Sequence, residues 1–297
     1  MNWRKLGKVI ECKNLNDWMV SHTSVPFAVH LWENVFRFYF SVRNKKNQSQ
    51  ASFVDFDLST MQIVNQLEKA PLLSPGGKDD FDTSGVTLSC YCAENDTFYY
   101  LGWHLPKNAP FANQIGLASF RGDILEKYEH NPVLGQCEIE PYTFGYPWVV
   151  KAKKQYFMWY DTNFFWNLQN PKNYKFPLRV ALSSDGINWK KCYHTCIELK
   201  DQERAIARPC VIYENDLFKM WYSIDVGGKY KLGYAQSEDG LSWLRLDDEI
   251  GISNSLQGWD SEEIAYPCVF DHQDKRYMLY NGNEYGKTGF GLAILEN

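Results

Sequence analysis

Four carboxylate side chains stand shortly before apolar segments of this chain, and they could serve acid–base chemistry. They are Asp82, Glu203, Glu262 and Glu263. Cleavage of a glycosidic bond uses one carboxyl group to protonate the leaving oxygen and another as base or nucleophile. Crowding and burial raise the pKa of one such group and keep it protonated near neutral pH. We predict catalytic roles, with Glu203 as general acid, Glu262 or Glu263 as base and Asp82 as an orienting group. The alternative is that these acids cap turns or pair with Arg and Lys at a rim.

A second set of side chains could bind a sugar. Aromatic rings stack on the apolar faces of sugars and leave the hydroxyls for Asn, Asp and His. Arg208 could hold Glu203, or bind a carboxylate or phosphate group of a ligand. Trp166 lies in the aromatic loop 162–167, which could instead pack over a neighbouring repeat. The predicted substrate-binding residues are His22, Trp103, His104, Asp161, Trp166, Arg208, Tyr266 and Asn281.

The sequence predicts neither a metal site nor a cofactor. Its eight cysteines read as small buried hydrophobic residues in a reducing compartment. Cys192 and Cys196 lack a second pair of ligands at zinc spacing. His22 and His104 belong to no recognisable set of metal ligands.

The elements that must position these residues come from a repeat. Four segments combine a Pro with following apolar residues, and a fifth has Gly in place of Pro. These anchors lie at positions 26, 85, 147, 209 and 267, so their separations are 59, 62, 62 and 58 residues. A near-constant period of this length indicates a repeat architecture.

Each repeat contains three predicted strands, the first of which starts at the anchor. The second strands are Phe36–Val42, Phe98–His104, Tyr156–Asp161, Phe218–Ile224 and Arg276–Asn281. The third strands are Ala51–Phe56, Gln114–Phe120, Leu178–Ser183, Lys231–Ser237 and Gly289–Leu295. Apolar strands between Gly and Asp turns are typical of antiparallel sheets that are covered on both faces.

A fourth, outer strand follows in two repeats. Asp-Gly pairs at 185–186 and 239–240 indicate type I′ turns, and the Trp after each turn would open the outer strand. The last repeat stops before such a strand, but Asn2–Leu6 resembles Asn188–Cys192. We therefore predict that the N-terminal strand pairs with the last repeat and closes a ring. The predicted fold class is all-β, as a single five-bladed β-propeller domain that spans residues 1–297.

Charge and hydropathy narrow the classes of partner. The formal net charge is −5 and there is no long Lys/Arg run, so nucleic-acid and anionic-membrane partners are disfavoured. No stretch approaches the roughly 18 apolar residues of a membrane span. No apolar signal segment follows Met1–Lys5. We expect a cytoplasmic protein whose partner is a carbohydrate.

The repeats resemble those of the five-bladed propeller glycosidases of glycoside hydrolase families 43, 32 and 130. The resemblance covers the whole chain and is strongest over Ala207–Trp243 and Trp259–Leu295. The chain looks most like uncharacterised glycosyl-hydrolase-like proteins of polysaccharide biosynthesis clusters. The resemblance thus implies a hydrolase of carbohydrate metabolism.

Those families use three acids around a central channel, from the first blade, a middle blade and a later blade. The resemblance implies that Glu203 is the late Glu and that Asp82 is the middle acid. Ser21–Ser24 occupy the place of the first-blade Asp. Either Glu262 or Glu263 takes the base role, or the reaction differs. Family 130 relatives often use phosphate as acceptor, so phosphorolysis and glycosyl transfer stay open.

The leading hypothesis is an enzyme that cleaves or transfers a glycosidic bond of a sugar or glycan intermediate. A non-catalytic glycan-binding propeller is the first alternative. A platform for protein interactions is the second, because a fold does not determine its function.

Overall fold

The regular structure of this protein is almost entirely β. The structure, a computed structural model, describes residues 1–65, 67, 69–171 and 173–296. Within these ranges there are twenty strands, one four-residue helix, α1 (Asn283–Gly286), and one 3-10 turn, η1 (Asp247–Glu249). The predicted all-β class is confirmed.

The strands form antiparallel units of four. Unit I contains β2 (Ser21–Trp32), β3 (Val35–Arg43), β4 (Ser49–Asp57) and β5 (Gln62–Ile63). Unit II contains β6 (Gly85–Cys92), β7 (Thr97–His104), β8 (Ala112–Arg121) and β9 (Ile124–Lys127). Unit III contains β10 (Thr143–Ala152), β11 (Gln155–Asn163), β12 (Leu178–Ser183) and β13 (Lys190–Ile197). Unit IV contains β14 (Glu203–Glu214), β15 (Leu217–Val226), β16 (Lys229–Ser237) and β17 (Leu244–Arg245). Unit V contains β18 (Ala265–His272), β19 (Lys275–Asn281), β20 (Phe290–Leu295) and β1 (Trp3–Ile10).

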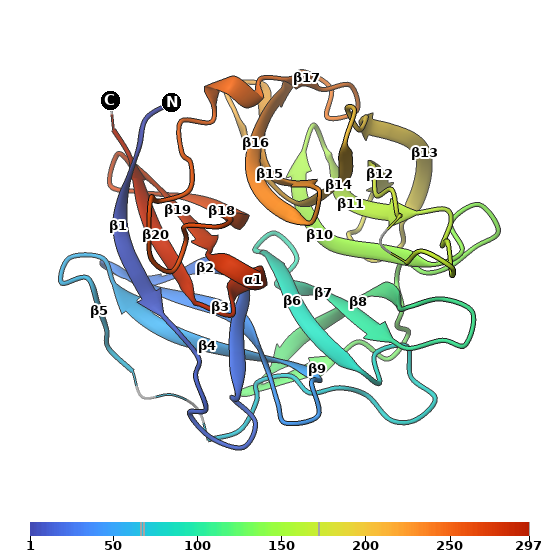
Figure 1. Cartoon of the computed structure of the whole chain (residues 1–297), viewed down its shortest axis with the longest axis horizontal. Coiled ribbons are helices and arrows are strands. Elements are labelled where there is room, and N and C mark those ends of the chain that lie inside the picture. Colours follow the sequence, from blue (N-terminus) through green and yellow to red (C-terminus); the bar gives the residue numbers. More distant parts are fainter. Residues whose placement is uncertain (66, 68, 172, 297) are drawn as a thin grey trace.

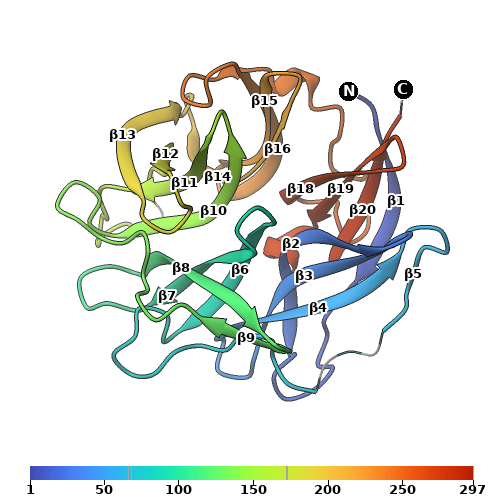
Figure 2. The ribbon, with the colours of Figure 1, turned by 180° about the vertical axis from the view of Figure 1, so that it is seen from behind.

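The units stand around a common centre (Figures 1 and 2). The first strand of each unit contacts the first strand of the next, in the order β2, β6, β10, β14 and β18, and β18 contacts β2 again. A single parallel pairing between Ser49 and Gly85 joins units I and II into one sheet. The first strands therefore surround the region where side chains of all units can meet.

The N-terminal strand completes unit V, as the sequence predicted. β1 pairs antiparallel with β20, so that Trp3 lies opposite Leu295. The Trp3 side chain is buried in a cluster that also holds Trp221 and Met278. The two ends of the chain are thus joined by backbone hydrogen bonds and by apolar packing.

A bulge interrupts four of the first strands at the residue before the anchor proline. Val25, Tyr146, Arg208 and Tyr266 have φ values of 57°, 38°, 53° and 54°. The pairing with the second strand shifts register at each of these places. Proline has no N–H to donate, so it is tolerated at a bulge inside a sheet, and a bulge re-aims the side chains beside it. The strand continues on both sides, and β2 and β14 therefore begin five or six residues before the anchor prolines at 26 and 209.

The two Asp-Gly turns connect units rather than forming type I′ hairpins. Only the glycines, Gly186 and Gly240, have a positive φ, whereas a type I′ turn needs it at both central residues. The Asp185 carboxylate instead accepts the N–H groups of Ile187 and Asn188. Tyr99 of unit II donates its hydroxyl proton to the Gly186 carbonyl, and Trp159 of unit III donates to that of Gly240. The predicted turn type was wrong, but outer strands do follow both turns.

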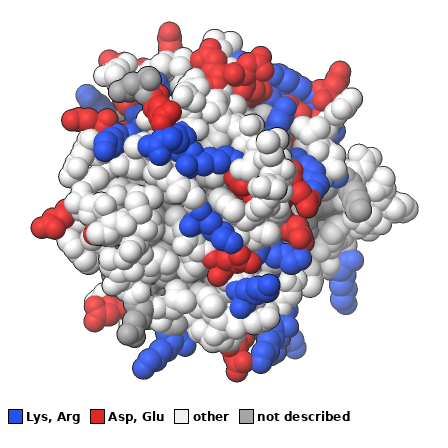
Figure 3. Space-filling view, turned by 60° about the vertical axis from the view of Figure 1, so that its left-hand side comes forward, with Lys and Arg blue, Asp and Glu red and all other residues white. Residues whose placement is uncertain are grey.

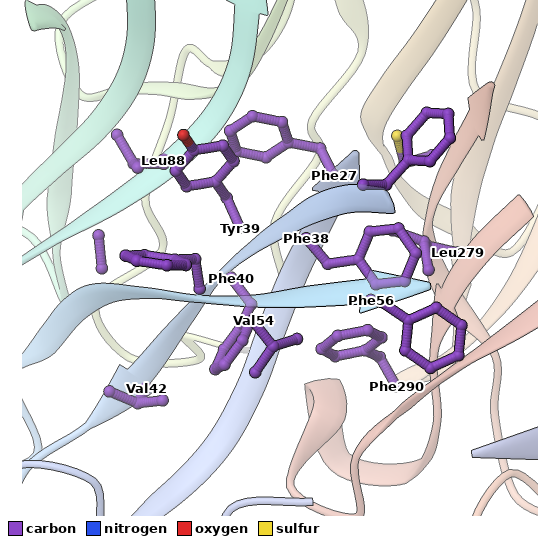
Figure 4. Close-up of a cluster of buried hydrophobic side chains, with 14 of the residues drawn as sticks. Phe27, Phe38, Tyr39, Phe40, Val42, Val54, Phe56, Leu88, Leu279 and Phe290 are labelled. Atoms are coloured by element: carbon purple, nitrogen blue, oxygen red, sulfur yellow. The ribbon is translucent and has the colours of Figure 1, made fainter. Parts of the chain in front are cut away.

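Apolar side chains fill the spaces between neighbouring units. In Figure 4, Phe38 and Phe40 of unit I face Phe290 of unit V, with ring centroids 6.4 and 5.5 Å apart. Leu88 of unit II joins the same cluster from the other side. Each unit is therefore covered on both faces, which explains strands that are apolar on both sides.

Charged side chains of both signs are scattered over the face shown in Figure 3. None of the helices in the described ranges has the length and apolar character that a membrane crossing requires.

We expect Trp3→Ala to lower the free energy of unfolding by about 3–5 kcal/mol, because it empties a buried site in the closing strand. Ile124→Ala is the matched control, since Ile124 also lies on an outermost strand but is 65% exposed. Urea unfolding measures both variants. Equal effects would contradict a closing role for β1.

Candidate functional site

A cavity of about 440 Å³ lies where the first strands converge, and all five units contribute to its wall. This volume is in the range of small-ligand sites. Its lining combines aromatic rings with hydroxyl and amide groups. Among the described residues that line it, Asp161 is the only carboxyl group and Arg43 the only Lys or Arg side chain.

Four tyrosines form one wall of the cavity. Tyr146 and Tyr266 project from the bulges of β10 and β18, with ring centroids 5.1 Å apart. Tyr230 lies 5.6 Å from Tyr266 and 5.7 Å from Tyr285. Burial raises the pKa of Tyr146, Tyr230 and Tyr266, so these hydroxyls stay neutral at physiological pH. The wall offers flat apolar faces edged by hydroxyl groups, which suits a sugar ring.

Glu263 holds this wall in place. Its side chain is 3% exposed, and its two oxygens accept the backbone N–H groups of Tyr230 (2.9 Å) and Tyr285 (3.0 Å). Glu263 therefore positions two tyrosines without lining the cavity itself. Its neighbour Glu262 is exposed and pairs with Lys229.

Asp161 is a buried carboxyl group that faces the cavity. Burial raises its pKa to about 7, although backbone N–H groups of Asp161 and Arg208 donate to it and oppose the shift. Among the described residues, its Oδ1 has no hydrogen-bond partner. Opposite it on β10 is Gly145, where a Cβ would come within 2.2 Å of Asp161 Oδ2. Glycine at this position thus makes room for the carboxyl group.

Two hydroxyl groups share this property with Asp161. Ser41 and Thr143 belong to the cavity lining and are buried, and their side-chain oxygens have no partner among the described residues. Buried polar atoms in proteins are nearly always hydrogen-bonded. Three residues of the cavity lining thus carry a polar atom without a partner among the described residues.

Most of the other buried acids near the unit starts are held in what we call acid clasps. In each clasp a buried acid of one unit pairs with a Lys or Arg of the fourth strand of the same unit. The pairs are Asp82–Lys127 (2.6 Å), Glu140–Lys191 (3.2 Å), Glu203–Arg245 (2.8 Å) and Asp260–Lys5 (2.6 Å). Tyr100, Tyr160 and Tyr280 of the second strands donate hydroxyl protons to Asp82, Glu140 and Asp260, respectively.

Two of the predicted catalytic residues, Asp82 and Glu203, are clasp acids. Neither Asp82 nor Glu203 lines the cavity. Burial raises the pKa of Glu203, but hydrogen bonds from Arg245 and the Lys200 N–H outweigh it, and the pKa lies below its ordinary value. A general acid must carry a proton at working pH. The pairing alternative explains both carboxylates, while their catalytic roles, and those of Glu262 and Glu263, stay predictions.

Unit I has no acid clasp. Met19 lies seven residues before Pro26, the spacing that separates Glu140 from Pro147, and it is fully buried. Phe40 stands where units II, III and V have the clasp tyrosine, and it has no hydroxyl. The acid and the hydroxyl are absent together, so unit I contributes no buried carboxylate here.

The predicted sugar-binding residues fall into two groups. Asp161, Tyr266 and Trp103 line the cavity, and Trp103 Nε1 donates to Ser49 Oγ at 2.8 Å. Trp166 is buried, and its ring centroid lies 4.9 Å from that of Phe111. Its side chain therefore packs against a neighbouring segment, which was the alternative to an exposed binding loop.

The remaining four make structural contacts. His104 bonds the Phe81 carbonyl, and Asn281 accepts the Val25 N–H and donates to the Thr23 carbonyl, linking units V and I. His22 is mostly buried, which with Arg43 and Lys287 lowers its pKa to about 4.

Arg208 is fully buried at the centre. Its guanidinium lies 4.8 Å from the Trp148 ring and donates to the carbonyls of Pro26 and Pro209. It does not hold Glu203, and it does not line the cavity.

Sequence reasoning missed several residues of the cavity lining. Ser41 could have been found, because it follows the aromatic residue of its second strand as Asp161 follows Tyr160. Tyr230 and Tyr285 lie outside the anchor pattern, and no local signal placed them together. No three His, Cys, Asp or Glu side chains gather as a metal site in the described ranges.

Comparison with known proteins gives the family. No family model matches the chain. It is 38% identical over 301 residues to uncharacterized protein MT1551 of Mycobacterium tuberculosis strain CDC 1551, covering 100% of both chains. Uncharacterized protein Rv1502 of strain H37Rv matches with the same identity and coverage. The chain therefore belongs to the same protein family as MT1551 and Rv1502.

A shorter match is to a 1,2-beta-oligomannan phosphorylase of Thermoanaerobacter sp. strain X514. It is 33% identical over 89 residues, which are 27% of this chain and 29% of that protein.

Solved structures with the same fold are glycoside hydrolases, as the sequence resemblance implied. A complex of BT0996 with RGII superposes with a TM-score of 0.76, at 15% identity, over 99% of this protein and 91% of that one. A thermostable family-43 glycoside hydrolase gives 0.66 at 15% identity, over 93% and 90%. A Bombyx mori GH32 beta-fructofuranosidase in complex with sucrose gives 0.62 at 15% identity, over 93% and 61%. The resemblance to families 43 and 32 is confirmed for the fold.

We expect Glu203→Gln to lower the free energy of unfolding by roughly 3 kcal/mol, because it breaks the buried ion pair with Arg245 and leaves that arginine without this carboxylate. Ligand binding by the folded protein should be unchanged. Urea unfolding and calorimetry measure the two effects. Glu262→Gln, in an exposed ion pair, is the control and should stay within about 0.5 kcal/mol of the parent. Unchanged stability together with lost turnover would restore the general-acid role of Glu203.

Proposed function

We propose that this protein is a single five-bladed β-propeller, residues 1–297, that acts on a glycan and binds a sugar unit in the central cavity. The cyclic contacts of the first strands support the five blades. The tyrosine wall and the unsatisfied polar atoms of Ser41, Thr143 and Asp161 support a sugar as ligand. The glycoside hydrolase fold of the structural neighbours agrees with this choice.

Asp161 is the observation that carries the proposal. A carboxyl group with a pKa of about 7 can both give and take a proton near neutral pH. Asp161 lines the cavity and its Oδ1 has no partner among the described residues, so we assign it the proton that the leaving oxygen of a glycosidic bond receives. We therefore assign Asp161 the acid role in cleavage or transfer of that bond.

The nucleophile that attacks the sugar cannot be activated here by a second carboxylate of the described cavity lining, as it is in a two-carboxylate hydrolase. No second carboxylate among the described residues lines the cavity, whereas hydrolysis by the usual route needs a pair. An acceptor that carries its own nucleophilic oxygen, such as phosphate or a sugar hydroxyl, removes this requirement. Phosphorolysis or glycosyl transfer thus fits the site better than hydrolysis.

The same observation favours a second candidate, a propeller that binds a glycan without turnover. A single carboxyl group is sufficient for hydrogen bonding to sugar hydroxyls. A cytoplasmic location and a role in polysaccharide synthesis also belong to the proposal. The first rests on the cysteines and on the residues that follow Met1–Lys5, and the second on the sequence resemblance.

The functional test starts from a glycan array that identifies a ligand for the wild-type protein. We expect turnover of that ligand with phosphate or a sugar acceptor, and a loss of about 10²–10⁴-fold in rate for Asp161→Asn with binding retained. Binding without turnover in the wild type would select the second candidate. An array without any bound glycan would reject both.

The stability of the protein should also depend on Asp161. The folded-state pKa is about 7 and the ordinary value is 3.8, so the folded state holds this proton more tightly than the unfolded state. The contribution of Asp161 to stability therefore falls as pH rises from about 4 to 7. Asp161→Asn removes this loss, and its melting temperature relative to wild type should rise by several degrees between pH 4.5 and pH 8.

Differential scanning fluorimetry across this range measures the effect. Asp274→Asn, at an exposed turn, is the control and should show a constant difference. A constant difference for Asp161→Asn as well would mean that the carboxyl group is ionised throughout.

A further inference from the structure

Arg43 is an exception among the arginines of this protein. It is the last residue of β3, lines the cavity, and donates from Nη1 to the Asn47 side-chain oxygen at 2.8 Å. Among the described residues, no carboxylate forms an ion pair with it. Seven other strand arginines are paired with carboxylates, namely Arg4, Arg37, Arg121, Arg179, Arg204, Arg245 and Arg276. Arg208 also lacks such a partner, but it is sealed at the centre.

The surroundings of Arg43 leave its charge uncompensated. Unit I has no clasp acid, and Asp17 pairs with Lys45 at 2.6 Å. Glu284, on the unit V side, pairs with Lys287 at 2.7 Å. His22 is held neutral by burial and by Arg43 itself, since its pKa falls to about 4.

A second donor lies beside Arg43 on the same face of the strand. Ser41 is two residues earlier on β3, and alternate residues of a strand share a face. Ser41 is buried in the cavity lining, and its Oγ has no partner among the described residues. A guanidinium and a hydroxyl on one face can together bind an oxyanion, for which arginine geometry is well suited.

The units therefore contribute different chemical groups to the cavity lining. Unit I provides the cation and a hydroxyl donor, and unit III provides the carboxyl group of Asp161. The tyrosines of units III, IV and V provide the flat wall. A neutral sugar would use the wall and Asp161 and leave the Arg43 charge unmatched.

We propose that the ligand is an acidic sugar, whose carboxylate, phosphate or sulfate substituent is bound by Arg43 and Ser41 while its ring lies against the tyrosine wall. This inference rests on the proposed function, because it assumes a sugar in the cavity. It goes further by naming the class of sugar and the residues that select it.

The test compares acidic sugars with their neutral counterparts by calorimetry. The probe pairs are D-glucuronate with D-glucose, D-galacturonate with D-galactose, and D-mannose 6-phosphate with D-mannose, each in low salt. We expect the acidic member of at least one pair to bind at least tenfold more tightly. Arg43→Gln should remove this preference while keeping the affinity for the neutral member, and Arg43→Lys should restore part of it.

Lys45→Gln is the matched control. It removes one positive charge from the same unit, but Lys45 is exposed and does not line the cavity. It should leave the preference for acidic sugars unchanged. A loss of preference in this variant would indicate long-range electrostatics rather than contact with Arg43. The melting temperature of each variant is measured to confirm that it is folded.

Four outcomes would overturn the proposal. Equal affinity for acidic and neutral sugars, or a preference that survives Arg43→Gln, would reject an acidic sugar while leaving the proposed function intact. Inorganic phosphate that binds through Arg43 as tightly as any acidic sugar would assign the site to a free anion. If no sugar of either kind binds, the proposed function itself is rejected.

Discussion

The centre of this molecule depends on a bulge in the first strand of a unit, at the residue before proline. Proline cannot donate to the neighbouring strand, and the residue before it adopts a positive φ, so the pairing shifts register. The shift turns one side chain toward the middle. Tyr146 and Tyr266 reach the cavity in this way, and Arg208 occupies the core beneath it. Such a backbone is costly for non-glycine residues and persists because neighbouring units hold it on both sides.

Buried charge is distributed according to a second constraint. A carboxylate out of water requires a partner, and four units supply one from their own outer strand. This arrangement ties the inner end of a unit to its outer edge. Unit I, with Met19 and Phe40, does not use it. Arg43, on β3 of the same unit, also forms no ion pair with a carboxylate among the described residues, so unit I differs from the other units in two ways.

The fold and the site carry different information about function. Glycoside hydrolases share this fold at about 15% identity, and a shared fold does not transfer a catalytic set. Two residues of the predicted catalytic set, Asp82 and Glu203, are instead partners in clasps. The one carboxyl group that faces the cavity, Asp161, owes its raised pKa to burial beside Gly145. The acid–base chemistry that we propose therefore depends on a few positions, such as Asp161, where one unit differs from the others.

The sequence by itself determined the all-β class, the repeated strands and the pairing of the N-terminal strand, because these follow from local apolar runs and a constant period. Only the tertiary structure decided which carboxylates face the cavity. Glu203 and Arg245 are separated by 42 residues, and no local pattern pairs them. The bulges matter equally, since a shift of one residue moves a side chain to the other face of a strand. Tyr230 and Tyr285 meet because distant segments pack together, so their place in the wall could not be derived from the sequence.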